Sequence, residues 1–156
     1  MLKWLWLSLL VIVLDQLSKL WVVSEFELYQ SIELMPYLNL TYVHNKGAAF
    51  SFLSSAGGWQ RWFFSVISVV AVLVLLVWLK RLKSTEKLLA VSMSLILGGA
   101  IGNLYDRLAY GYVIDFLDAY YQQWHWPVFN IADSAIVLGV GLMLLDMFIT
   151  PNQEDK

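Results

Sequence analysis

The sequence predicts an all-α membrane protein in which four transmembrane helices carry a small extracytoplasmic β-sheet. Of its 156 residues, 60% are hydrophobic and only 14% are charged, whereas an average soluble domain has roughly 25% charged residues. The mean hydropathy of +0.65 indicates the same. A soluble fold of this size leaves too much surface exposed to hide so many apolar side chains, and this composition also excludes intrinsic disorder. Lipid is therefore the expected solvent for much of the chain.

Four stretches have the ~20 mostly apolar residues that a bilayer-spanning helix needs. They cover about residues 4–23, 62–79, 88–105 and 129–149. The first stretch has a basic start, as a signal peptide does, but no A-x-A cleavage site follows it and its apolar character continues past Lys19. We therefore expect a retained helix and a single integral membrane domain over residues 1–156.

The orientation in the membrane follows from the link between the second and third spans, which carries Lys80, Arg81, Lys83 and Lys87 against Glu86. The positive-inside rule places this link and both termini in the cytoplasm and the segments 24–61 and 106–128 outside. The first outer segment contains an alternating run of β-formers at 37–43, which predicts a small sheet. The second is rich in Tyr and Trp, which predicts a loop lying on the bilayer.

Several chemistries are excluded by what the sequence lacks. The net charge of −2 implies no nucleic-acid partner. Without cysteine there are no disulfides, thiolate nucleophiles or Cys-ligated metals. No H-E-x-x-H or G-x-S-x-G motif occurs, and we interpret His44 and His125 as an outer-loop and an interfacial residue rather than ligands. The sequence calls for no metal and no cofactor.

Ionisable side chains at membrane depth each cost about 2.5–3.5 kcal/mol on insertion scales and therefore need a partner or a function. Asp15 and Lys19 are four residues apart on one helix face, which fits an ion pair or a substrate-orienting site. Asp106 and Arg107, at the end of the third span, fit an interfacial flank of opposite charges. That interpretation does not explain the nearby Asn103.

Three outer-face motifs have ordinary structural interpretations when each is taken alone. Asn45 and Gly47 suit a turn. Asp115 and Asp118 could be solvated loop carboxylates. Asn130 and Asp133 have the spacing of a capping box at the start of the fourth span.

Taken together, Asp115 and Asp133 belong to the same outer face and flank the entry of the fourth span. Two carboxylates that meet at a partly dry interface cannot both ionise cheaply, so one keeps a proton while the other stays charged. The charged acid can then take a proton from water while the neutral acid polarises a carbonyl. This pairing predicts an aspartyl hydrolase.

The motifs together resemble the bacterial lipoprotein signal peptidases (signal peptidase II) over nearly the whole chain. The matching pieces, in family order, are Asp15-x-x-x-Lys19, Asn45-x-Gly47-Ala-Ala-Phe50, Gly98-Gly-x-x-Gly-Asn-x-x-Asp-Arg107, Val113-Ile-Asp-Phe116 and Phe129-Asn-x-Ala-Asp133. The resemblance implies an aspartyl endopeptidase of the bacterial inner membrane, without a metal, whose active site lies at the outer face. It further implies an outer β-cradle lying on the bilayer.

The resemblance also implies the substrate and the site. Family members remove the signal peptide from prolipoproteins whose lipobox cysteine already bears diacylglyceryl, and they cut just before that cysteine. Asp115 and Asp133 would be the catalytic pair. Residues that position the substrate or orient the pair would be Asp15, Lys19, Asn45, Gly47, Asn103, Arg107 and Asn130. The expected partners are lipid-modified prolipoproteins and membrane phospholipid, and a monomer is expected.

Two alternatives from other classes remain at this point. One is a small transporter or ion-pathway subunit in which Asp15, Lys19 and Asp133 form a polar relay. The clustering of acids at one face disfavours a conduit, which should place ionisable groups at several depths. The other is a structural helix bundle that assists a larger complex, in which neutral replacements of both aspartates would be tolerated.

Overall fold

The computed structural model describes residues 1–47 and 58–149. A short 3₁₀ turn, η1 (Leu2–Trp4), leads into α1 (Leu5–Glu25), and the other helices are α2 (Trp59–Arg81), α3 (Lys87–Ala109) and α4 (Ile131–Ile149). All four helices are long and apolar enough to cross a membrane. The predicted fold class is therefore confirmed. The Ala-Ala-Phe part of the motif at 45–50 lies outside the described residues.

The helices differ from the predicted spans mainly at their ends. Helix α3 continues through Asp106 and Arg107 to Ala109, because polar side chains that find partners can extend a helix beyond its apolar stretch. Helix α4 starts at Ile131 rather than at 129, because Phe129 forms a bridge to Leu117 in a neighbouring strand.

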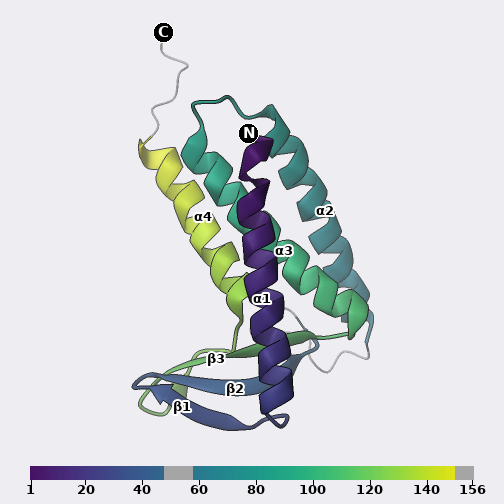
Figure 1. Cartoon of the computed structure of the whole chain (residues 1–156), viewed down its shortest axis with the longest axis vertical. Coiled ribbons are helices and arrows are strands. Elements are labelled where there is room, and N and C mark those ends of the chain that lie inside the picture. The colour runs from purple at the N-terminus through teal and green to yellow at the C-terminus, as the bar shows by residue number, and fades with distance from the viewer. Residues whose placement is uncertain (48–57, 150–156) are drawn as a thin grey trace.

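A four-stranded antiparallel sheet in the order β1-β2-β3-β4 crosses one end of the bundle (Figure 1). Its strands are β1 (Ser31–Met35), β2 (Leu38–Asn45), β3 (Val113–Tyr121) and β4 (Trp124–His125). The β-run predicted at 37–43 lies in β2. The loop predicted at 106–128 is wrong in its middle, because 113–121 pairs with β2 through partners such as Leu40 with Leu117 and His44 with Ile114.

Helix α3 is the centre of the bundle and packs against each of the other three helices (Figure 1). Lipid is as apolar as the side chains, so small residues that let backbones approach closely drive such packing. A Cβ atom on Gly98 would lie 2.8 Å from the Ser8 carbonyl oxygen of α1, and one on Gly99 would collide with the Ala132 carbonyl oxygen of α4. The glycines of α3 therefore fix the positions of α1 and α4.

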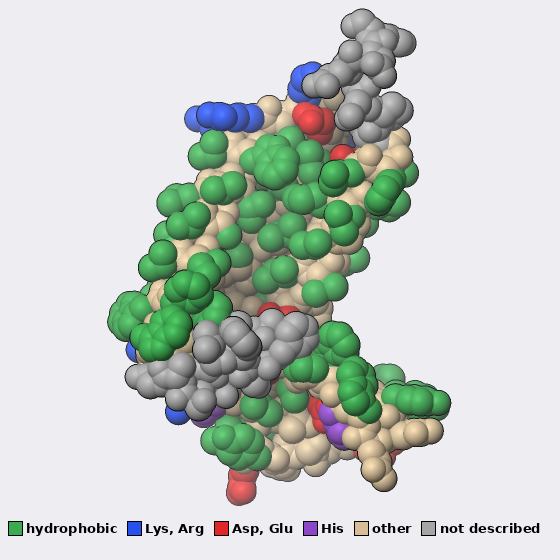
Figure 2. All heavy atoms as spheres, turned by 180° about the vertical axis from the view of Figure 1, so that it is seen from behind, with side chains coloured by type: hydrophobic (Ala, Val, Ile, Leu, Met, Phe, Trp, Pro, Cys, Tyr) green, Lys and Arg blue, Asp and Glu red, His purple; other side chains and the backbone are tan. Residues whose placement is uncertain are grey.

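Among the described residues, three apolar clusters complete this arrangement. One joins α2 to α3 and has the fully buried Leu79 and Met93 at its centre. The second joins the outer end of α1 to the sheet through Val22, Tyr42 and Phe116. The third is smaller and joins α1, α3 and α4 through Val11, Leu95 and Ala135. Many other large apolar side chains of the helices are exposed and cover the face of the bundle seen in Figure 2, as a lipid-facing surface requires. The sheet is thus attached rigidly to the helix that carries Asp15 and Lys19.

Gly99→Ala should destabilise the protein, since its new methyl group meets backbone of α4 rather than a movable side chain. We expect a loss of about 1–3 kcal/mol, typical of overpacking, measured as a lower thermal midpoint in detergent. Gly141→Ala is the matched control, because a Cβ there meets nothing within 4 Å. Equal midpoints for the two variants would contradict the close packing of α3 on α4.

Candidate active site

Asp115 lies in β3, where it is 1% exposed and pairs with Val43 of β2. Its Oδ2 accepts a hydrogen bond from Asn45 Nδ2 at 2.9 Å, and its Oδ1 accepts one from Asn130 Nδ2 at 2.7 Å. Two amides from different elements therefore hold this carboxyl in one orientation.

Asp133 lies in the first turn of α4. It forms a capping box with Asn130, as the sequence predicts. Asn130 Oδ1 accepts from the Asp133 N–H at 2.9 Å, and Asp133 Oδ2 accepts from the Asn130 N–H at 3.3 Å. The other oxygen, Oδ1, accepts from Asn103 Nδ2 of α3 at 2.7 Å. A carboxylate here is favoured by the helix dipole and by otherwise unsatisfied N–H groups.

Phe129 connects strand β3, which carries Asp115, to the start of α4, which carries Asp133. Its N–H donates to the Leu117 carbonyl at 3.0 Å, and its carbonyl accepts from the N–H groups of Phe116 and Leu117 at 3.0 and 2.8 Å. The next residue, Asn130, is fully buried and hydrogen-bonds to both Asp115 and Asp133. One asparagine thus joins two acids that are 18 positions apart in the sequence (133 − 115 = 18).

Burial and, after it, the neighbouring Asp133 carboxylate raise the pKa of Asp115 from an ordinary 3.8 to about 7. The hydrogen bonds from Asn45 and Asn130 and the charge of Lys19 oppose this rise. Asp115 therefore exchanges its proton near neutral pH, as a group that must act as an acid or a base needs to do.

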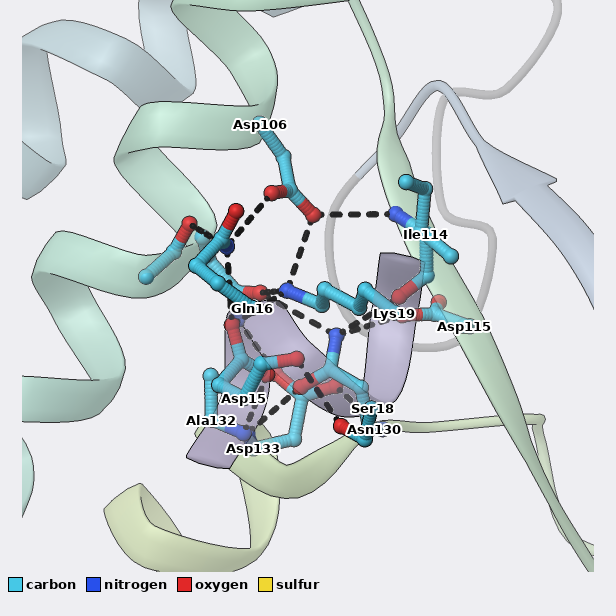
Figure 3. Close-up of polar contacts among 12 residues, drawn as sticks. Asp15, Gln16, Ser18, Lys19, Asp106, Ile114, Asp115, Asn130, Ala132 and Asp133 are labelled. Atoms are coloured by element: carbon cyan, nitrogen blue, oxygen red, sulfur yellow. Dashed lines mark hydrogen bonds and ion pairs between the residues drawn. The ribbon is translucent and has the colours of Figure 1, made fainter. Parts of the chain in front are cut away.

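Lys19 makes two buried ion pairs (Figure 3). Its Nζ lies 2.8 Å from Asp15 Oδ2 and 2.8 Å from Asp106 Oδ2, and it donates to Asn103 Oδ1 at 3.0 Å. The ion pair expected between Asp15 and Lys19 is present. We call Asp15, Lys19 and Asp106 the lysine cluster.

The interpretation of Asp106 as an interfacial flank is wrong, because its side chain is fully buried. It lies three residues after Asn103 on the same inward face of α3. Helix spacing of three residues could have indicated this, since Asn103 was already unexplained. Gln16, which no sequence motif singles out, donates to Asp106 Oδ1 at 2.9 Å.

Arg107 and Gly47 link the outer segment to α3. The Arg107 guanidinium donates to the Asn103 carbonyl at 3.2 Å and to the Gly47 carbonyl at 3.4 Å, and it lies over the Phe64 ring at 5.6 Å. The Gly47 N–H donates to Asn45 Oδ1 at 3.0 Å, which leaves the Asn45 amide nitrogen directed to Asp115. All the residues predicted for the site thus join one hydrogen-bonded network.

A cavity of about 690 Å³ adjoins this network. Its polar wall includes Asn45, Asn103, Arg107, Asp133 and Ser134, and its apolar wall includes residues 126–129 and 136–138. Figure 2 shows a hollow in this face of the bundle with acidic side chains at its base. Asp133 lines the cavity directly, and Asp115 adjoins it through Asn45. The size suits an organic ligand.

The structure also settles the surroundings of the histidines. His44 lies in β2, where it hydrogen-bonds to the Tyr42 hydroxyl at 2.7 Å and stacks on Tyr112 at 3.7 Å. His125 Nδ1 lies 2.8 Å from Asp118 Oδ1. Asp118 is 5% exposed, so its interpretation as a solvated carboxylate is wrong. Within residues 1–47 and 58–149, no group of three His, Asp or Glu side chains could hold a metal ion.

Four membrane-crossing helices with a buried acidic network at one end define a multi-pass membrane protein. A family profile described as signal peptidase (SPase) II matches residues 7–149, and the chain belongs to this family. The expected family membership is confirmed.

Named relatives and a solved structure are also similar to this chain. A protein of Alteromonas mediterranea named lipoprotein signal peptidase is 58% identical over 147 residues, covering 94% of this chain and 81% of that protein. A protein of Shewanella halifaxensis with the same name is 55% identical over 155 residues, covering 99% and 91%. A solved structure described as a bacterial membrane enzyme has a TM-score of 0.86 at 30% identity and covers 99% of this chain and 93% of its own.

Asp115→Asn should change how stability depends on pH. The folded protein holds the Asp115 proton up to about pH 7, whereas an unfolded chain releases it near 4. Wild-type stability therefore falls as pH rises between these values, and the asparagine variant lacks this contribution. We expect the thermal midpoint of the variant, relative to wild type, to rise from pH 4 to pH 8, on the order of 5 °C. A difference independent of pH would contradict a raised pKa.

Proposed function

We propose that this protein is an intramembrane aspartyl endopeptidase that removes the signal peptide from diacylglyceryl-modified prolipoproteins and cuts before the lipidated cysteine. Family membership supports a peptidase that acts on lipoproteins. The observation that carries the aspartyl assignment is the double contact of Asn130, whose Nδ2 donates to Asp115 and whose backbone N–H donates to Asp133.

The chemistry needs a single proton shared by the two acids. The ionised acid takes a proton from a water molecule as the water oxygen bonds to the scissile carbonyl carbon. The neutral acid gives its proton to the carbonyl oxygen, so that a neutral diol intermediate forms. The acid that received the water proton then protonates the leaving amide nitrogen, the C–N bond breaks, and the remaining carboxylate recovers a proton from the diol. The dyad returns to its starting charge.

The cavity supports a lipid-bearing substrate. Its polar wall can bind the peptide backbone, whereas its apolar wall includes Val137 and Leu138 of α4, which are 72% and 56% exposed on the surface of the bundle. Acyl chains could therefore reach the cavity from the bilayer while the scissile bond lies beside the acids. Excluding bulk water there strengthens the electrostatic interactions of the dyad.

The same proposal includes an orientation in the bacterial inner membrane. The basic link between α2 and α3 and the start of α1 lie at the end of the bundle opposite the sheet (Figure 1). The positive-inside rule supports a cytoplasmic location for that end, with both termini inside and the acids outside. Exposed aromatic side chains on the sheet, among them Tyr37, Tyr121 and Trp124, suit the headgroup layer of phospholipids. We propose that the protein acts as a monomer.

Asp115→Asn and Asp133→Asn should each abolish cleavage, because an amide can neither take the proton of water nor share one with its partner. We expect rates lower by about 10⁴-fold or more, assayed with purified protein on a diacylglyceryl-modified prolipoprotein. Asp118→Asn is the control, since it changes a buried acid of β3 outside the network. Full turnover by either dyad variant would end the aspartyl assignment. Solute or proton flux in proteoliposomes without cleavage would favour a transporter.

Asn130→Ser should separate the two roles of Asn130. Serine caps a helix as well as asparagine does, so the thermal midpoint should stay close to that of wild type. Serine cannot replace the Nδ2 that donates to Asp115. We expect kcat to fall about 10- to 100-fold. Retained kcat would show that Asn130 acts only as a helix cap.

A further inference from the structure

Asp106 has no place in the predicted site, yet its contacts reach the backbone next to a proposed catalytic acid. Its Oδ2 accepts from the Ile114 N–H at 3.1 Å, and Ile114 immediately precedes Asp115. The same oxygen pairs with Lys19 at 2.8 Å, and the other oxygen accepts from Gln16 at 2.9 Å. Both oxygens of this carboxylate are therefore fully used (Figure 3).

Asp15 makes the matching contact on the other side of the lysine cluster. Its Oδ1 accepts from the Ala132 N–H at 2.9 Å, and Ala132 immediately precedes Asp133. The two carboxylates paired with Lys19 thus hold the backbone directly before each acid of the proposed dyad. Lys19 itself donates to Asn103, whose amide nitrogen donates to Asp133.

Stability alone does not account for this arrangement. Buried ion pairs are often no more stable than well-packed apolar side chains of the same volume, whereas removing one member leaves an uncompensated charge. A carboxylate oxygen is nevertheless a strong, directional acceptor for a backbone N–H group. In the lysine cluster, the Asp106 carboxylate accepts such a bond from Ile114. This bond joins α3 to β3 one residue before Asp115.

We propose that Asp106 is a positioning residue for the peptidase reaction, acting by fixing the Ile114 N–H and so the place of Asp115 relative to Asp133. This inference rests on the proposed function. Asp106 is fully buried, and the cavity is lined by Asn103 and Arg107 of the same helix rather than by Asp106. It therefore acts through Asp115 and not by contact with the substrate.

The test compares Asp106→Asn, which keeps an acceptor oxygen for Ile114, with Asp106→Ala, which removes it. Asp118→Asn is the control because it removes a buried carboxylate of β3 from outside the lysine cluster. We expect kcat to fall roughly tenfold for the asparagine variant and about 100-fold for the alanine variant. KM should stay within about twofold of wild type, since the cavity wall is unchanged.

A second measurement separates positioning from a loss of folded protein. Among the described residues, Asp106→Asn leaves Lys19 paired with the Asp15 carboxylate alone. The lysine charge therefore favours ionised Asp115 more strongly. The pKa of Asp115 should then fall by roughly 0.5–1 unit, observed as a shift of the kcat profile to lower pH and in the ¹³C resonance of the Asp115 carboxyl. Within the described residues, the charged groups that act on Asp115 directly or through a shared partner are Asp15 and Lys19 of α1, Asp106 and Arg107 of α3 and Asp133 of α4.

The outcomes are distinct. Graded kcat losses with an unchanged profile for Asp118→Asn would bear the inference out. Wild-type kcat and pH profile in the folded fraction of Asp106→Ala would overturn it, even if the thermal midpoint falls, and would leave the proposed function standing as long as Asp115→Asn is inactive. Absence of cleavage by the wild-type protein would overturn both.

Discussion

The ammonium group of Lys19, buried between two carboxylates, is the interaction on which the rest of the site depends. A lone charge at this depth would be prohibitively costly, so both acids must be present and correctly placed for α1 to pack as it does. Each carboxylate then holds a backbone N–H group, Asp15 that of Ala132 and Asp106 that of Ile114. A single buried cation thereby ties together α1, α3, the start of α4 and strand β3.

Because the bilayer is the solvent, glycine and polar side chains hold the helices together. Apolar contact gives helices little reason to associate in lipid, so close backbone approach and hydrogen bonds must hold them together. Gly102 shows both effects at one position, since a Cβ there would lie 2.7 Å from Asp15 Oδ2. The absent side chain leaves room for the carboxylate, and the neighbouring Asn103 reaches Lys19 and Asp133. Packing and site geometry are therefore set by the same few residues of α3.

The helices could be predicted from the sequence because hydropathy and length are sufficient for them, whereas strand β3 could not. Asp115 and Asp118 interrupt its apolar pattern, and their burial depends on side-chain donors of β2 that lie 70 to 79 positions earlier in the sequence. The interpretation of Asp106 as a surface charge was wrong for a related reason. Next to Arg107 it resembles a surface charge pair, and its true partner Lys19 lies 87 positions earlier (106 − 19 = 87). Patterns over a few residues cannot report partners at such separations.

The choice of groups around the two acids fits the proposed chemistry. In the described part of the chain, the side-chain donors to Asp115 and Asp133 are the neutral amides of Asn45, Asn103 and Asn130. A guanidinium in direct contact would hold either acid ionised, but Arg107 donates to backbone carbonyls instead. Amides orient a carboxyl without fixing its charge. Lys19 contacts Asn103 rather than the two acids, and Asn103 in turn donates to Asp133. A dyad that must pass one proton back and forth requires this separation of orientation from charge.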